Sequence, residues 1–180
     1  MSFFQSYLQT MNRHIQMVDF SLMKELADLL RSVSEKGSKV IIVGNGGSAA
    51  IASHIAVDLT KNARVRTVDF NEASLITCFA NDYGYEKWVE KAIEFYADKN
   101  DLVILISSSG MSPNIVNAAT KAKEMGLPVI TFSGFDSNNL LKQLGTLNFW
   151  VNSRNYNIVE MTHNIWLVTI IDYITDKMEY

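Results

Sequence analysis

The sequence has little of what marks secreted, membrane-spanning or nucleic-acid-binding proteins. Its 180 residues include one cysteine, Cys78, which excludes an internal disulfide and favours a reducing compartment. No apolar run approaches the ~20 residues that a membrane span needs, and the N-terminus lacks the pattern of a signal peptide. The formal net charge of -3 offers no basic surface to nucleic acid. We therefore expect a cytoplasmic protein with neither a membrane nor a nucleic-acid partner.

Proline is also scarce, with only Pro113 and Pro128, and no linker, repeat or low-complexity tract divides the chain. Hydrophobic residues make up 48% of the sequence and charged residues 19%, a balance typical of a compact α/β domain. We expect a single domain over residues 1–180, with N-terminal helices over 1–37 and an α/β core over 38–180.

The hydrophobic pattern predicts the order of the elements. Apolar residues at helical spacing predict helix over residues 2–36, which Gly37 ends. Five short apolar runs then predict strands, at residues 39–44, 65–70, 101–107, 128–133 and 146–151. Helical patterns separate and follow them, at roughly 47–61, 72–80, 85–98, 112–125, 137–143 and 157–178.

Strands without strict alternation, separated by helices, predict a parallel sheet that helices cover on both faces. The expected fold is α/β: a three-layer, doubly wound, five-stranded parallel sheet of flavodoxin-like type with an N-terminal helical extension. In such sheets ligands bind beyond the carboxyl ends of the strands, so the residues that follow each strand are the candidates for function.

The first such stretch is a glycine-rich loop, "GNGGSAA", which follows strand 39–44 and opens a helix. Glycine lets a ligand approach the main chain, and the helix N-terminus attracts an anion. Two interpretations follow. Gly44, Gly46 and Ala49 match the G-x-G-x-x-A pattern of dinucleotide-binding domains, with Asp69 placed as a ribose-binding acid. The loop equally suits the phosphate of a smaller ligand.

A second loop, "SSSGMSPN", favours the smaller ligand. It follows the third predicted strand and places three serines and Gly110 directly before a helix. Ser112 is expected to cap that helix, with Pro113 in its first position. Hydroxyl groups facing a helix N-terminus form an anion pocket. A sugar phosphate needs two polar walls of this kind, so the dinucleotide becomes the minor alternative and no nucleotide cofactor is expected.

Both loops, together with "CFANDYGYE" at residues 78–86, resemble motifs of the sugar isomerase (SIS) domain family, and within it the bacterial phosphoheptose isomerases. The resemblance spans about residues 39–175. It implies a small phosphorylated sugar as ligand and a homotetramer whose active sites lie where subunits meet. The implied ligand-binding residues are Asn45, Gly46, Gly47, Ser48, Asp82, Ser107, Ser108, Ser109 and Ser112. Turn formation alone also explains Asp82, and a packed thiol is expected for Cys78.

Aldose–ketose isomerisation needs a base over two neighbouring carbons. His54 and Asp58 are four residues apart on the helix after the first loop and share one face. The resemblance implies that Asp58 is the base, at a position where the family normally has glutamate, and that His54 binds zinc. The alternative is a surface pair of Asp58 with Lys61.

The last helix carries Glu160 and His163, three residues apart. The resembled isomerases have a glutamine, a histidine three residues later and a catalytic histidine five beyond that. Aligning His163 with the middle histidine places Glu160 at the glutamine and Val168 at the catalytic histidine. A shifted alignment makes His163 catalytic and puts Asn155 at the glutamine.

Two histidine–carboxylate pairs have a composition that suits zinc, the predicted cofactor; they are His54, Asp58, Glu160 and His163. The expected catalytic residues are Asp58 and His163. The expected reaction converts sedoheptulose 7-phosphate to a heptose 7-phosphate for surface-polysaccharide synthesis. The alternatives are another sugar phosphate, or a non-catalytic SIS protein that acts through protein partners.

Overall fold

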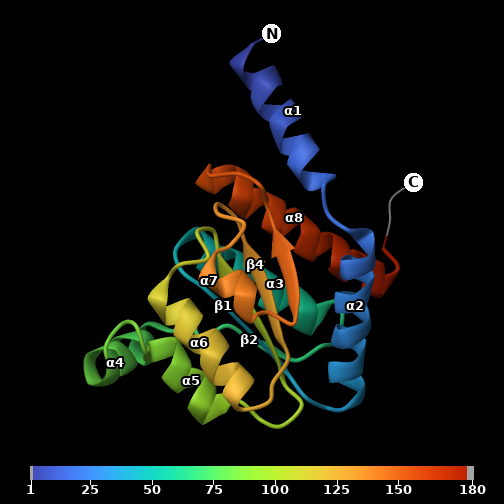
Figure 1. Ribbon diagram of the computed structural model, residues 1–180. Helices are drawn as coiled ribbons and strands as arrows, with labels where there is room; N and C mark the ends of the chain where they lie inside the picture. The colour runs from blue at the N-terminus through green and yellow to red at the C-terminus, as the bar shows by residue number, and fades with distance from the viewer. Residues whose placement is uncertain (1, 178–180) are drawn as a thin grey trace.

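The computed structural model describes residues 2–177 and has a five-stranded, all-parallel sheet at its centre (Figure 1). The strand order is β2-β1-β3-β4-β5, so the chain runs to one edge and then back across to the other. The strands are β1 (Val40–Gly44), β2 (Thr67–Val68), β3 (Leu102–Ser107), β4 (Val129–Ser133) and β5 (Leu147–Trp150). This order confirms the predicted doubly wound, flavodoxin-like fold.

Helices cover both faces of the sheet. The helices are α1 (Phe3–Ile15), α2 (Phe20–Glu35), α3 (Gly47–Lys61), α4 (Ala73–Tyr83), α5 (Trp88–Tyr96), α6 (Pro113–Glu124), α7 (Leu140–Leu144) and α8 (Tyr156–Thr175). One apolar core joins the sheet to α2, α3 and α8, and a second joins it to α5, α6 and α7. The sheet is therefore the middle of three layers, as predicted.

The strands differ in length according to their position. β1, β3 and β4 are buried along their whole length because helices pack on both of their faces. The predicted strand over 65–70 is mostly wrong, since only two of its residues pair with β1. Arg64 and Phe70, on either side of this pairing, have positive φ values of 60° and 58°, which extended strands do not allow.

The N-terminal segment consists of two helices, α1 and α2. The chain breaks at residues 16–19, where Asp19 caps α2 by accepting a hydrogen bond from the Ser21 backbone N–H at 2.8 Å. Helix α1 projects from the body (Figure 1), and its C-terminal end contacts α8, where Trp166 Nε1 donates to the Ile15 carbonyl at 2.8 Å. The only buried residue of α1 is His14.

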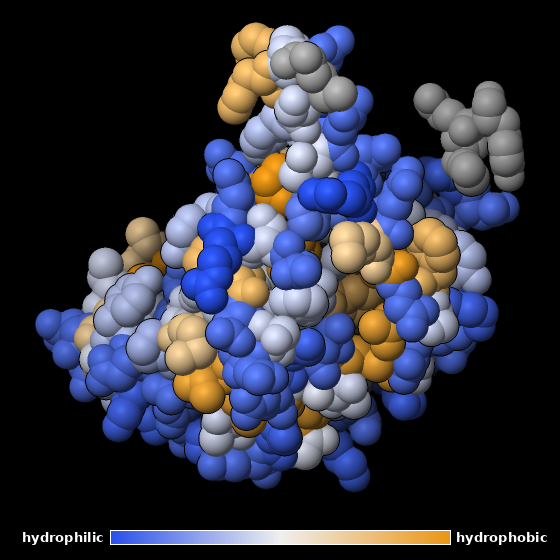
Figure 2. All heavy atoms as spheres, turned by 45° about the horizontal axis from the view of Figure 1, so that its top comes forward, coloured by the Kyte–Doolittle hydropathy of each residue, from blue (hydrophilic) through white to orange (hydrophobic). Residues whose placement is uncertain are grey.

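Exposed apolar side chains gather on the projecting helix and at the start of α2 (Figure 2). Phe3 and Phe4 are exposed, so neither is a core residue of this chain. Helix α4 is apolar in sequence yet has no buried residue, and its Cys78 is exposed. The expectation of a packed thiol is therefore wrong, because no other element covers that side of α4.

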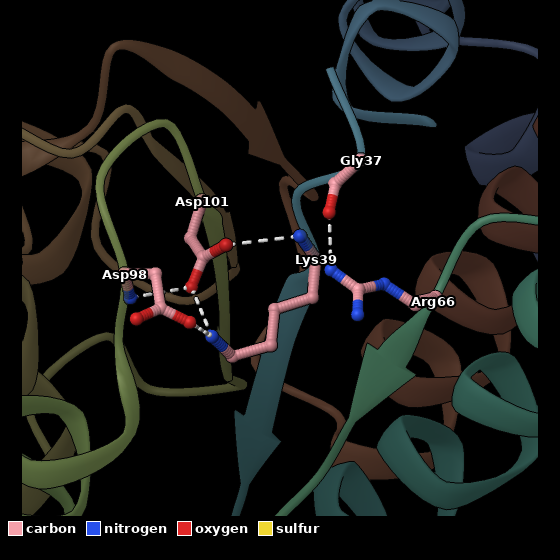
Figure 3. A network of polar contacts seen from close by, with 5 residues as sticks. All are labelled: Gly37, Lys39, Arg66, Asp98 and Asp101. Atoms are coloured by element: carbon pink, nitrogen blue, oxygen red, sulfur yellow. Dashed lines mark hydrogen bonds and ion pairs between the residues drawn. The ribbon is translucent and has the colours of Figure 1, made fainter. Parts of the chain in front are cut away.

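A polar network closes the amino-terminal edge of the sheet (Figure 3). The Asp101 carboxylate accepts hydrogen bonds from the Lys39 backbone N–H at 2.9 Å and the Asp98 N–H at 2.7 Å. Lys39 Nζ lies 2.6 Å from both Asp98 and Asp101, and Arg66 donates to the Gly37 carbonyl beside it. These contacts tie the starts of β1 and β3 together, at the opposite edge from the ligand-binding loops.

None of the helices that the structure describes is long and apolar enough to cross a membrane.

Candidate active site

Two loops meet where β1 and β3 end, and they enclose a cavity of about 110 Å³. The residues that line it are Asn45, Ser48, Ile106, Ser107, Ser108, Ser109, Ser112, Tyr156 and Glu160. All six predicted ligand-binding residues that carry a hydroxyl or amide side chain in the two loops are in this group. Parallel neighbouring strands bring them together, because the carboxyl ends of such strands lie at the same edge.

The serine loop is shaped by its own hydroxyl groups. Ser107 Oγ lies 3.1 Å from Ser112 Oγ, and Ser109 Oγ accepts a hydrogen bond from the Met111 backbone N–H at 3.2 Å. Ser112 occupies the N-cap position of α6, with Pro113 in the first turn, but its side chain makes no capping hydrogen bond. The predicted N-cap position of Ser112 is therefore confirmed, while its hydroxyl turns to Ser107 at the cavity wall.

Ser108 has a buried hydroxyl without a hydrogen-bond partner among the described residues. Nearly all buried polar groups in native proteins are paired, so an orphaned hydroxyl in a cavity wall calls for an external partner. A phosphate or sugar oxygen supplies an acceptor for this group.

The glycine loop forms the opposite wall. The side-chain amides of Asn45 and Asn114 bond each other twice, at 2.9 Å in both directions, and the Tyr85 hydroxyl donates to Asn45 Oδ1 at 3.2 Å. Gly44 must lack a side chain, since an added Cβ would lie 2.6 Å from the Cβ of Ser48. Sequence reasoning missed Tyr85 and Asn114, although both lie in motifs that it had singled out.

Glu160 reaches into this cavity from α8. A Cβ added to Gly47 would collide with its carboxylate, so the acid lies directly against the first residue of α3. Burial raises the pKa of the Glu160 carboxyl, and the neighbouring Ser108 hydroxyl acts in the opposite direction without forming a hydrogen bond of normal geometry. The sequence had placed Glu160 in a metal site; the structure places it beside the serine loop. Tyr156, one turn earlier on α8, was missed.

His54 and Asp58 form a pair on the exposed side of α3. His54 Nε2 lies 3.3 Å from Asp58 Oδ2, and Asn62 Nδ2 donates to Asp58 Oδ1 at 3.1 Å. Asp58 thus pairs with His54 and Asn62, and the alternative partner Lys61 is not in contact with it. Neither member of the pair lines the serine-loop cavity of the same chain.

His163 lies in the core. Its side chain is 0% exposed, its Nε2 is 3.0 Å from the Ser133 carbonyl, and its ring packs edge-on against Phe132. Burial lowers the pKa of His163 to about 4, against the opposing effect of the Ser133 contact. At neutral pH the ring is uncharged, with Nε2–H donating to the carbonyl. This position gives no support to its predicted roles as acid or ligand.

The four predicted metal ligands do not converge within one chain. Across residues 2–177, no three or more His, Cys, Asp or Glu side chains form a group that could hold a metal ion. The residues therefore do not fit a zinc site formed by a single subunit. Asp82 is exposed on α4, where it lies near Cys78 and does not line the cavity. Asp69 accepts a hydrogen bond from the Ser53 hydroxyl at 2.6 Å, away from the loops.

A doubly wound sheet whose carboxyl edge carries two polar loops, each opening a helix, is typical of phosphate-binding α/β domains. Comparison with known proteins narrows this class. The family model of the SIS domain matches residues 3–134. The chain belongs to the SIS domain family.

Several phosphoheptose isomerases are similar to the chain along most of its length. The protein from Fusobacterium nucleatum is 34% identical over 154 residues, which are 83% of this chain and 79% of that protein. The one from Helicobacter pylori strain P12 is 32% identical over 159 residues, 85% of this chain and 82% of its own. A solved phosphoheptose isomerase structure from Francisella tularensis superposes with a TM-score of 0.87 at 24% identity, covering 97% of this chain and 95% of the other; at that identity it shows the shared fold.

Proposed function

We propose that the protein is a phosphosugar aldose–ketose isomerase that converts sedoheptulose 7-phosphate to D-glycero-D-manno-heptose 7-phosphate. The observation that carries the proposal is the serine-lined cavity between two helix N-termini, with the unpartnered Ser108 hydroxyl in its wall. The names of the relatives supply the substrate. A cytoplasmic location and a role in surface-polysaccharide synthesis are part of the same proposal and rest on the single cysteine and on the product.

The phosphate group is assigned to the serine loop. The hydroxyls of Ser107, Ser109 and Ser112 and the N-terminus of α6 surround one end of the cavity. Ser48 and Asn45 provide polar groups on the facing wall. Helix N-termini and hydroxyl donors bind a phosphate dianion without needing a lysine or arginine.

The proposed chemistry moves one proton between two carbons. A carboxylate base removes a proton from C1 of the ketose, and the electron pair forms an enediolate with its charge on the C2 oxygen. Return of a proton to C2, with transfer of the C1 hydroxyl proton to the oxygen of C2, gives the aldose. Asp58 is the proposed base, and His54, 3.3 Å away, is placed to exchange protons with it or with the sugar oxygens.

The position of this pair supports an active site shared between subunits. His54 lies six residues after Ser48, which is a rise of about 9 Å and a rotation of roughly 240° around the helix axis. The pair therefore faces away from the cavity of its own chain, on an exposed face that includes Val57. We assign the base of one subunit to the sugar bound by another, within a homotetramer. The exposed apolar side chains of α1 and α4 provide surface for this assembly.

Zinc has no step in this scheme, because the described residues of one chain do not form a metal site. A time course of the sugar by NMR, with and without added zinc, tests the proposal. Asp58→Asn should abolish conversion of sedoheptulose 7-phosphate and leave sugar binding in place. Asp28→Asn, on the exposed face of α2, is the matched control and should keep full activity. Turnover by the Asp58→Asn protein would remove the assigned base.

A second candidate is a phosphosugar-binding SIS protein without catalysis, which acts through protein partners. The buried position of His163 favours it, as does the alignment that places Val168 at the position of the family's catalytic histidine. Sugar-induced shifts in the NMR spectrum without any new aldose signal would support this candidate against the isomerase.

A further inference from the structure

The cavity wall has an unusual charge for a phosphate site. Among the described residues that line the cavity, Glu160 is the only one with a formally charged side chain, and no lysine or arginine accompanies it. The remaining polar groups are hydroxyls, one amide and the phenol of Tyr156. A bound phosphate would therefore meet a carboxylate that no cation in the wall neutralises.

The carboxylate is placed in the cavity by its neighbours. It lies against Gly47, whose missing side chain leaves the space that the acid fills. Gly47 is the first residue of α3, and the N-cap residue Gly46 offers no side chain to cap the helix. A negative charge at a helix N-terminus is stabilised by the unpaired N–H groups and the helix dipole. The N-terminus of α3 therefore stabilises the Glu160 carboxylate in the same way as it would stabilise a ligand anion.

Space in the cavity is limited as well. Its volume of about 110 Å³ remains with the Glu160 side chain in place, and Ser108 on the opposite wall also adjoins the carboxylate. A phosphate dianion in the serine loop would lie within a few ångströms of this second anion. Like charges at such separations repel strongly in a partly buried site, because little water screens them.

We propose that Glu160 is the resident anion of this cavity and sets its affinity for phosphate: the phosphate group binds fully only when the Glu160 carboxylate leaves the N-terminus of α3. The inference deepens the proposed function and, for the sugar, rests on it. It assigns to Glu160 the control of phosphate binding. Gly47 is assigned the role of leaving room for the Glu160 carboxylate at the N-terminus of α3 when no phosphate is bound.

Calorimetric titration with two probes tests the assignment. Inorganic phosphate examines the cavity alone, and sedoheptulose 7-phosphate examines the complete site. Glu160→Gln keeps the shape of the side chain and removes its charge, so we expect it to bind both probes at least tenfold more tightly than the wild type. Glu160→Ala, which also empties the space, should gain at least as much. Glu124→Gln removes the same charge from the far end of α6 and should change either affinity less than twofold.

The outcomes separate the inference from the proposed function. Unchanged or weaker phosphate binding by Glu160→Gln, in a variant whose melting temperature matches the wild type, would overturn the inference even if the wild type isomerises the sugar. A tenfold gain for inorganic phosphate, with no binding of sedoheptulose 7-phosphate by any variant, would support the role of Glu160 and overturn the proposed substrate. Failure of all four proteins to bind inorganic phosphate would overturn the inference, and failure of all four to bind either probe would overturn the proposed function as well.

Discussion

Replacing Asp101 with alanine is expected to lower the free energy of unfolding by about 3 kcal/mol. The Asp101 side chain is 1% exposed and accepts hydrogen bonds from the Lys39 and Asp98 backbone N–H groups (Figure 3). Each N–H that loses its acceptor costs about 1 kcal/mol or more. Loss of the carboxylate beside Lys39 adds a similar amount. The sum, about 3 kcal/mol, is at the lower end of the destabilisation expected when one partner of a buried ion pair is removed.

Asp98 provides the matched control, because it contacts the same Lys39 Nζ at the same 2.6 Å but has a side chain that is 83% exposed. Water replaces most of what an exposed carboxylate contributes, so Asp98→Ala should have a much smaller effect than Asp101→Ala. Burial acts to lower the pKa of Lys39, and the hydrogen bonds and charges of the two aspartates raise it above its ordinary value. Lys39 therefore stays charged at neutral pH and needs a partner in both variants.

Urea unfolding monitored by circular dichroism measures the two differences, and thermal melting gives a second scale. A loss of 3 kcal/mol corresponds to a fall of about 6–12 °C in the melting temperature for a chain of this size. Asp101→Asn, which keeps one acceptor oxygen and loses the charge, should fall between wild type and Asp101→Ala. Equal losses for Asp98→Ala and Asp101→Ala would refute the reasoning, since burial would then not decide the strength of the contact.

Three further predictions concern the site and the core. Ser109→Ala should weaken phosphosugar binding by about tenfold or more, because a hydrogen bond to a charged group is lost; titration against the exposed-loop control Ser137→Ala measures this. For His163 the folded pKa of about 4 lies below its unfolded value near 6.5, so the unfolded state binds the extra proton between these limits and stability falls as the pH drops through them. Between pH 7.5 and pH 5, the free energy of unfolding measured in urea should therefore fall by about 2 kcal/mol less for His163→Gln than for the wild type. An equal fall in the two proteins would contradict the burial of the ring. Gly47→Ala should destabilise the wild type but be neutral or stabilising in the Glu160→Ala background, where the collision is gone; a double-mutant cycle without coupling would show that the two residues do not touch.

Hydrophobic patterning was enough to predict the core strands and the phosphate loops. β1, β3 and β4 are continuous apolar runs because helices cover both of their faces, and such runs are visible without knowledge of their partners. The serine and glycine loops follow these strands directly, so the rule that ligands bind at the carboxyl edge placed them together. β2 was overestimated because positive φ angles at Arg64 and Phe70, which no local signal marks, limit its pairing.

Side-chain roles on the helices were less predictable. The i, i+4 spacing of His54 and Asp58 predicted a pair, and α3 does form one. The i, i+3 spacing of Glu160 and His163 also predicted neighbours on one face, yet one reaches the cavity and the other is buried against Ser133. The two side chains diverge because Glu160 points toward Gly47 at the start of α3 and His163 toward Ser133 at the end of β4. Packing decides which side of this largely apolar helix faces each neighbour.

The sequence by itself determined the order of strands and helices, the doubly wound topology and the polar character of the two loops, since these follow from local periodicity and from the residues at strand ends. Only the tertiary structure decided that the hydroxyl of Ser112, the N-cap residue of α6, faces Ser107 instead of bonding a backbone N–H of the helix, that Cys78 is exposed, and that Glu160 lies against Gly47. The position of Glu160 and the exposure of Cys78 depend on which distant segments pack against them. The orientation of the Ser112 hydroxyl depends on which of two partners it bonds. Local sequence does not encode these outcomes, because they depend on the space and the charges that neighbouring residues provide in the folded protein.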